Sequence, residues 1–332
     1  MSESRLVTVA VDAVGGDNSP EQILAGVTMA LAADPSLHVL LTGPSEVITP
    51  FAASSTRVEA VPTTEIIGMN EHPANAVRTK KDSSIVVGCK LVKEGRADAF
   101  FSAGSTGACM AAATLVMGRV KGVQRPAIAT VMPTAGAPCV MLDVGANADC
   151  KPEHLLQFAF MGAAYASVVL GVIAPRVALL NIGEEPTKGS VLAQESHRLI
   201  AEKVPHFVGN IEGRDVMAGV TDVVVTDGFT GNVSLKLLEG TSRILLAQVR
   251  DAITSTPLAK TAAAVLKPAL SRLKDRLDPD TYGGAPLLGV QGVCIIGHGS
   301  SKAKAVANAI RVAAQAGRGG LTTQIRQAIA QN

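Results

Sequence analysis

Short runs rich in Val, Ile and Leu alternate along the chain with longer Ala- and Leu-rich segments. Several runs lack polar alternation, which is typical of strands that helices cover on both faces. The runs predicted as strands are Leu6–Val11, Leu37–Leu41, Ala99–Ser102, Ala127–Val131, Cys139–Leu142, Val177–Asn181, Val223–Thr226 and Val290–Ile296. The predicted helices are Pro20–Ala33, Ser83–Gly95, Thr106–Met117, Pro152–Leu170, Gly189–Val204, Asn232–Ala252 and Ser300–Ala316. This order predicts an α/β fold with a doubly wound, mostly parallel sheet.

One segment departs from this alternation. Residues 253–280 carry no strand signal and contain three prolines between Ala- and Leu-rich stretches. Within them, residues 258–277 place apolar side chains at helical spacing, opposed by Lys and Arg. Such a basic amphipathic segment either lies on an anionic membrane surface or forms a dimer-contact helix pair with a charged outer face. Because the sequence shows no repeat or low-complexity linker, we expect residues 1–332 to form one unit with two lobes around a cleft.

Composition narrows the class of protein. The chain has 332 residues, of which 47% are apolar and 17% charged, so most of it can form a packed core. No window reaches the roughly 20 uninterrupted apolar residues of a membrane-spanning helix. The N-terminus shows no export signal, so we expect a cytoplasmic protein. A net charge of +2 and 3% aromatic residues do not indicate nucleic-acid binding.

Cysteine usage points away from metal and disulfide scaffolds. The five cysteines are odd in number and include no C-x-x-C pair, so we expect buried reduced thiols.

Three turns share one layout, in which a predicted strand runs into a Gly-containing turn and then into a helix. They are Ser102–Gly107, Asp227–Asn232 and Gly297–Ser301. Helix starts of this kind offer free N–H groups and a positive dipole end to an anion, and glycine lets the backbone come close to it. Any single turn is more simply explained as an N-cap, but three together favour an anion site.

Nucleotide motifs are missing from these turns. The Gly297-His-Gly299 run lacks the third glycine of G-x-G-x-x-G, and no G-x-x-x-x-G-K-[ST] occurs. A dinucleotide or Walker-type phosphate site is therefore disfavoured.

Three further turns follow predicted strands. The turns Asp12–Asp17 and Asp143–Asn147, the latter with Asp149 close behind, either orient a ligand, bind a metal or hold Asx turns. In the first, two adjacent glycines give a backbone that a substrate can approach. The turn Asn181–Gly189 carries Lys188, which is either a solvated surface group or a point charge for an anion.

Six motifs together resemble one family. They are Val11–Asn18, Ser102–Ala108, Asp143–Asn147, Asn181–Glu185, Asp227–Asn232 and Gly297–Ser301. Their order and spacing are similar to those of the acyl-acyl-carrier-protein:phosphate acyltransferases of bacteria, from about residue 7 to 316. Ser105 stands where that family often has Asn, and Thr230 where it often has Val.

The resemblance implies a fold, a reaction and partners. The fold is a three-layer α/β/α unit like isocitrate dehydrogenase or phosphotransacetylase, in a homodimer. The reaction moves a fatty acyl group from acyl carrier protein to inorganic phosphate, without an organic cofactor. Basic clusters at residues 78–81 and 119–125 would steer the acidic carrier protein, or are solvated loop charges. Peripheral contact with the membrane and with a downstream acyl-phosphate-using membrane acyltransferase would fit such a product.

The resemblance and the turns give candidate site residues. We expect phosphate to be held by Ser102, Gly104, Ser105, Thr106 and Gly107, with help from Lys188. We expect Asp227, Asn232 and His298 to orient phosphate or the developing oxyanion and to protonate the departing thiolate. His298 is the only histidine embedded in a Gly/Ser turn. The further substrate-binding candidates are Asp12, Gly15, Gly16, Asn147, Gly299 and Ser300.

Rival functions differ in donor or in class. A phosphotransacetylase-type enzyme would take a short acyl group from coenzyme A. A decarboxylating dehydrogenase is disfavoured because no nucleotide motif or metal-binding carboxylate set is evident. A membrane-associated scaffold would bind without turnover.

Overall fold

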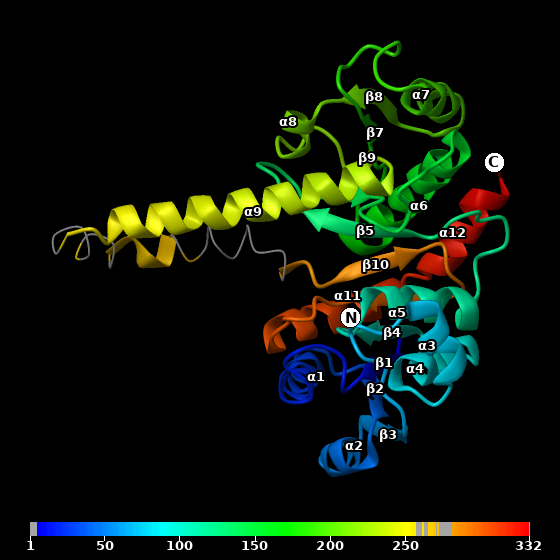
Figure 1. The fold of residues 1–332 in the computed structure, drawn as a ribbon, viewed down its shortest axis with the longest axis vertical. Helices are drawn as coiled ribbons and strands as arrows, with labels where there is room; N and C mark the ends of the chain where they lie inside the picture. Colours follow the sequence, from blue (N-terminus) through cyan, green and yellow to red (C-terminus); the bar gives the residue numbers. More distant parts are fainter. Residues whose placement is uncertain (1–4, 257–260, 262–264, 270, 272–280, 332) are drawn as a thin grey trace.

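A computed structural model describes residues 5–256, 261, 265–269, 271 and 281–331. Eleven strands of this described part form one sheet, in the order β3-β2-β1-β4-β11-β10-β5-β6-β9-β7-β8 (Figure 1). The strands are β1 Val7–Asp12, β2 Leu37–Gly43, β3 Val58–Pro62, β4 Ala99–Ser102, β5 Ala127–Met132, β6 Cys139–Leu142, β7 Val177–Leu180, β8 Phe207–Ile211, β9 Val223–Val225, β10 Ala285–Leu288 and β11 Val293–Ile296.

Strand direction divides this sheet into two parallel blocks. The strands β3, β2, β1, β4 and β11 all run the same way, and so do β6, β9, β7 and β8. Between them, β10 is antiparallel to β11 and β5, and β5 is antiparallel to β6. The two blocks therefore run in opposite directions.

Helices cover both faces of the sheet and make three layers (Figure 1). One face packs against α1, α2, α6, α7, α11 and α12, and the other against α3, α4, α5, α8 and α9. The helices are α1 Glu21–Ala33, α2 Ser45–Ala52, α3 Pro73–Thr79, α4 Ser84–Lys93, α5 Thr106–Ala112 continued by the π-helix Ala113–Met117, α6 Pro152–Leu170, α7 Val191–Lys203, α8 Gly213–Val216, α9 Gly228–Ile253, α11 Ala303–Arg318 and α12 Leu321–Ala330.

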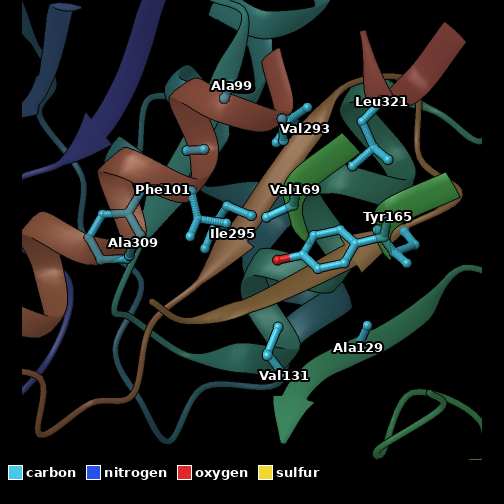
Figure 2. Close-up of a cluster of buried hydrophobic side chains, with 14 of the residues drawn as sticks. Ala99, Phe101, Ala129, Val131, Tyr165, Val169, Val293, Ile295, Ala309 and Leu321 are labelled. Carbon is cyan, nitrogen blue, oxygen red and sulfur yellow. The ribbon is translucent and has the colours of Figure 1, made fainter. Parts of the chain in front are cut away.

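The uninterrupted apolar runs are explained by this layering. Successive residues of a strand point to opposite faces, so Phe100 and Phe101 of β4 enter the cores of opposite faces, and both are fully buried. Figure 2 shows Phe101 in one core with Ile295 of β11 and Tyr165 of α6. A mostly parallel α/β sheet is thus confirmed.

The structure adds elements that the sequence did not predict. The strands β3, β8 and β10 and the helices α2, α3, α8 and α12 were not expected. The helix α9 begins at Gly228, four residues before the predicted start, and β11 begins at Val293 rather than at Val290. The edge strands β3 and β8 were not recognised because Glu59 and Pro62 interrupt the apolar run of β3, and Gly209 and Asn210 interrupt that of β8.

The predicted amphipathic segment is only partly described. Of residues 253–280, those from 253 to 256, 261, 265–269 and 271 lie within the described structure. Val265 and Leu266 there are exposed. The membrane and dimer interpretations of this segment both remain predictions.

Among the described helices, α6 is long and apolar enough to cross a membrane by length and composition alone. Of this stretch, 67% is buried inside the protein, and it packs against β6, β9, α7 and α12. Such burial is typical of a core helix.

The cysteines are free, and four of the five are buried. Burial raises the pKa of the Cys109 thiol to about 12 and makes its thiolate form rare. The expectation of buried thiols is confirmed except at Cys150, which is half-buried.

Candidate functional site

Three of the expected turns lie side by side because β1, β4 and β11 are neighbouring parallel strands. They span residues 12–19, 102–107 and 297–301, and we call them the first turn group. Carboxyl ends of adjacent parallel strands are where ligands bind in open α/β sheets.

The centre of the first turn group is a buried hydrogen-bonded chain. The Ser102 hydroxyl donates to Asp12 Oδ2 over 2.7 Å and accepts the Gly104 N–H over 3.0 Å. Asp12 Oδ1 also accepts the Val14 N–H. Burial raises the pKa of Asp12, and its hydrogen bonds, that from Ser102 foremost, oppose the rise. Because Ser102 is fully buried and its hydroxyl is engaged, this geometry favours a supporting role over direct contact with an anion.

Glycine is required where the first two turns meet. A Cβ on Gly15 would lie 2.5 Å from Asp12 Oδ2 and 2.7 Å from Gly104 N. Gly16 has a φ of +94°, and its Cβ would lie 2.9 Å from the carbonyl oxygen of Gly299. The Gly15-Gly16 pair thus lets the three turns interlock.

The turn after β11 is tied to the turn after β1. The Asp17 N–H donates to the Gly299 carbonyl over 2.8 Å, and Asn18 Nδ2 donates to the Ser300 carbonyl over 3.1 Å. These bonds fix the backbone directly after His298.

His298 is exposed, and its contacts identify its neutral tautomer. The ring Nδ1 lies 2.8 Å from Ser300 Oγ and 3.4 Å from the Ser300 backbone N–H. A backbone N–H can only donate, so Nδ1 is the acceptor and the neutral ring carries its proton on Nε2. The imidazole can therefore donate a hydrogen bond from Nε2.

The turn after β4 leads into helix α5. Ser105 is its N-cap and accepts the Ala108 N–H over 3.4 Å. Thr106 is exposed, and Gly107 lies against Pro73. The first N–H groups of a helix have no intrahelical acceptor, so those of residues 105–107 are available to a ligand.

A second turn group forms at the ends of β6 and β9. The buried Asp143 carboxylate accepts N–H bonds from Ile128, Gly145, Ala146 and Asn147, and Asn147 Nδ2 also donates to it over 2.8 Å. Burial raises the pKa of Asp143, and these bonds oppose the rise. A carboxylate so fully occupied anchors its own turn, which favours the Asx-turn interpretation over a metal site.

The predicted residues Asp227 and Asn232 belong to this second turn group. Asp227 caps α9, accepting the Thr230 N–H and hydroxyl, each over 2.8 Å. Asn232 is exposed and lies near Gly145, while the Gly228 N–H donates to the Asn147 carbonyl over 2.8 Å. The N-terminal turn of α9 is therefore seated on the turn after β6.

Lys188 is exposed in the turn after β7, which neighbours β9. The Lys188 carbonyl accepts from Asn181 Nδ2, and Asn210 Nδ2 donates to the nearby Glu185 carbonyl. Its ammonium has no ion pair among the described residues. By strand order, Lys188 lies with the second turn group rather than with residues 102–107.

The two turn groups differ in strand direction. No hydrogen bond or ion pair of the described residues joins them. The likeness of turns 102–107, 227–232 and 297–301 suggested one shared anion, but only the first and last lie in one group.

Comparison with known proteins decides the family. The family described as "Fatty acid synthesis protein" matches residues 7–324. A phosphate acyltransferase of Heliobacterium modesticaldum is 51% identical over 92% of this chain and 93% of its own length. One from Desulfitobacterium hafniense is 50% identical over 96% of each chain. The chain belongs to this family of phosphate acyltransferases.

Two solved phosphotransacetylase structures share the fold of this phosphate acyltransferase family member. A phosphotransacetylase from Streptococcus pyogenes superposes with a TM-score of 0.61 at 16% identity, covering 94% of both chains. The EutD phosphotransacetylase from Staphylococcus aureus gives 0.59 at 17% identity, with the same coverage. At such low identity the likeness concerns the fold alone, and it confirms the phosphotransacetylase-like fold.

Neither a metal-ligand cluster nor a pocket offers a second candidate site among the described residues. Within the described residues, no group of three or more His, Cys, Asp or Glu is placed to hold a metal ion. A pocket lined by Thr8, His38, Arg57 and Arg96 lies at the amino-terminal halves of β1, β2 and β3, away from both turn groups. Ligands of open α/β sheets bind at the carboxyl ends of the strands, so the turns remain the candidate site.

Sequence reasoning missed one neighbour of the first turn group. The segment from Ile66 to Pro73 lies against it, with Met69 beside Gly299 and Pro73 beside Gly107. It follows a strand that was not predicted and carries no motif, so only the tertiary structure reveals its position.

Proposed function

We propose that this protein transfers a fatty acyl group from the thioester of acyl carrier protein to inorganic phosphate and so forms an acyl phosphate. The observation that carries the proposal is the interlocked first turn group, in a chain about half identical to phosphate acyltransferases along nearly its whole length. Acyl phosphate would then serve phospholipid synthesis.

Phosphate would be held by the start of α5. The N–H groups of Ser105, Thr106 and Gly107 and the exposed Thr106 hydroxyl supply donors for a tetrahedral anion. The hydrogen bonds from Ser102 to Asp12 and from Gly104 to Ser102 would hold the backbone that carries these donors. Donors fixed in advance need no reorganisation during the reaction.

His298 would serve the acyl group. A phosphate oxygen attacks the thioester carbon, the carbon–sulfur bond breaks, and the departing thiolate takes up a proton. The Nε2 proton of His298 can stabilise the oxyanion or move to the sulfur. No covalent intermediate on the protein is required, which suits cysteines that are mostly buried and have raised pKa values.

Asp227, Asn232 and Lys188 are proposed to act from the second turn group, together with Asn147. Asn232 and Lys188 are exposed and can meet a ligand, whereas the Asp227 carboxylate already caps α9. If Asn232 or Lys188 contacts the acyl donor while phosphate is bound in the first turn group, the donor must extend from the first turn group to the second.

An acidic carrier protein would be steered by exposed cations. Arg78, Lys81, Lys121 and Arg125 are exposed, whereas Lys80 is paired with Glu71 over 2.7 Å. Surface attraction is screened by salt, so turnover with carrier-bound substrate should fall as ionic strength rises.

We also propose a cytoplasmic homodimer, with peripheral contact to the membrane through residues 258–277 and delivery to a membrane acyltransferase. Support comes from α9, which extends away from the sheet (Figure 1) and exposes a row of apolar side chains. The row consists of Phe229, Val233, Leu237 and Ile244.

Donor choice tests the proposed reaction. Purified protein is supplied with phosphate and either a long-chain acyl carrier protein or acetyl coenzyme A, and acyl phosphate is measured. We expect turnover with the carrier-bound donor that depends on phosphate. Turnover with acetyl coenzyme A alone would indicate a phosphotransacetylase, and binding without turnover would indicate a scaffold.

A further inference from the structure

The segment Ile66–Pro73, between β3 and α3, extends across the first turn group. The methyl carbon of Met69 lies 3.3 Å from the position that a Cβ of Gly299 would occupy. The Cγ atom of Pro73 lies 2.6 Å from the equivalent position at Gly107. One short segment therefore borders both the turn that carries His298 and the turn that starts α5.

Polar contacts hold this segment in place. Glu71 Oε1 accepts the Gly68 N–H over 2.6 Å and a proton of Lys80 Nζ over 2.7 Å. Lys80 Nζ also donates to the carbonyl of Ile66 over 2.8 Å. Because Ile67 is buried as well, the segment is fixed beside the turns, and its other side chains have defined positions.

Two large apolar side chains of the segment remain at the surface. Ile66 is 47% and Met69 is 49% exposed, and Met69 borders the polar turn that carries His298. Apolar surface next to a binding site gains free energy only when an apolar ligand covers it. A fatty acyl group reacting beside His298 would be such a ligand.

We propose that Met69, supported by Ile66, forms an apolar wall for the acyl chain and thereby sets the preference for long chains. This inference rests on the proposed function and deepens it. Phosphate needs no apolar contact, so the wall should act on the acyl donor alone. Methionine suits the role because its flexible thioether adapts to a mobile chain.

The test compares kcat/KM for a long-chain and a medium-chain acyl group on the same carrier protein. The substitution Met69→Gln keeps length but removes apolar character, and it should reduce the preference for the long chain by about 10-fold, leaving KM for phosphate unchanged. Met69→Leu should retain the preference. Met29→Gln is the matched control, since Met29 is 47% exposed on α1.

The outcomes separate the inference from the proposed function. An unchanged ratio of the two donors in Met69→Gln, or an equal loss for both, would overturn the wall while leaving the phosphate acyltransferase activity standing. A parent protein that makes no acyl phosphate from either donor would instead overturn the proposed function, and the inference with it.

Discussion

At the residue scale, two buried carboxylates support the turns that border the site. Asp12 and Asp143 each follow a buried strand, accept hydrogen bonds from their own turn and have a pKa raised by burial. Neither has an ion pair among the described residues. Their ionised forms therefore depend on hydrogen bonds alone.

The raised pKa of Asp12 predicts a pH-dependent effect of Asp12→Asn. Between the ordinary pKa of 3.8 and the raised folded value, the folded state binds more protons than the unfolded state. The parent's stability therefore falls as pH rises through this window, and the asparagine variant lacks this loss. Urea unfolding should show the variant's deficit in unfolding free energy shrinking as pH rises above about 4. A deficit that is constant or grows would contradict the raised pKa.

Tyr165 offers a second prediction at this scale. Its hydroxyl has no hydrogen-bond partner among the described residues and points into the apolar cluster of Figure 2. An unpaired buried hydroxyl costs about 1–3 kcal/mol. Tyr165→Phe should therefore raise the free energy of unfolding by about 1 kcal/mol in urea titrations, and a comparable loss would show that the hydroxyl is paired.

The residue types at the strand ends could be predicted, but several of their roles could not. Strand runs followed by glycine turns correctly placed Ser102 at the end of a strand and Asp227 between a strand and a helix. Whether a hydroxyl faces a ligand or a buried carboxylate depends on a partner 90 positions away, as with Ser102 and Asp12. Local sequence carries no signal of that partner.

At the element scale, the two ends of helix α9 differ in how closely they pack against the other described residues. Gly228 and Gly231 sit against the turn after β6, where a Cβ on Gly231 would overlap the carbonyl oxygen of Asp143. Farther along, a Cβ on Gly240 would meet none of the described atoms within 4 Å.

Gly231 and Gly240 of α9 give a matched pair of substitutions. Gly231→Ala forces the backbone of α9 or of the β6 turn to move, and it should cost about 2–3 kcal/mol of stability. Gly240→Ala should instead stabilise the protein by about 0.5–1 kcal/mol, because alanine favours helix. Urea unfolding of both variants measures the difference, and equal effects would mean that α9 is not seated on Asp143.

Strands were predicted correctly where both of their faces are buried. The central strands are buried on both faces, so their apolar runs were recognisable. The strand β10 contains Pro286, which lowers strand propensity, and the edge strand β8 is half-exposed. Such elements are stabilised by neighbours that the local sequence does not reveal.

At the scale of the whole molecule, strand order and direction decide which turns meet. Local patterns could not show that β10 and β5 reverse the sheet between the two blocks. The turns after β4 and β9 look alike in sequence, yet they belong to strands that run in opposite directions. The motifs predicted the fold, but the grouping of the site residues required the topology.

The exposed row of α9 predicts the oligomeric state. If Phe229, Val233, Leu237 and Ile244 contact a second copy, Leu237→Glu should shift the protein from dimer to monomer, because it buries an unpaired charge. Light scattering coupled to gel filtration measures the mass. Val191→Glu, at an apolar position 73% exposed on α7, is the control and should leave the dimer intact. A dimer in both variants would exclude this face of α9.

The most direct test of the account is to locate an oxyanion in crystals of the protein. Arsenate, a tetrahedral analogue of phosphate, can be found by its anomalous scattering. We predict that it lies about 3 Å from the N–H groups of Ser105, Thr106 and Gly107, with His298 beside it. Arsenate at the start of α9, next to Asp227 and Asn232, with the first turn group empty, would contradict the assignment.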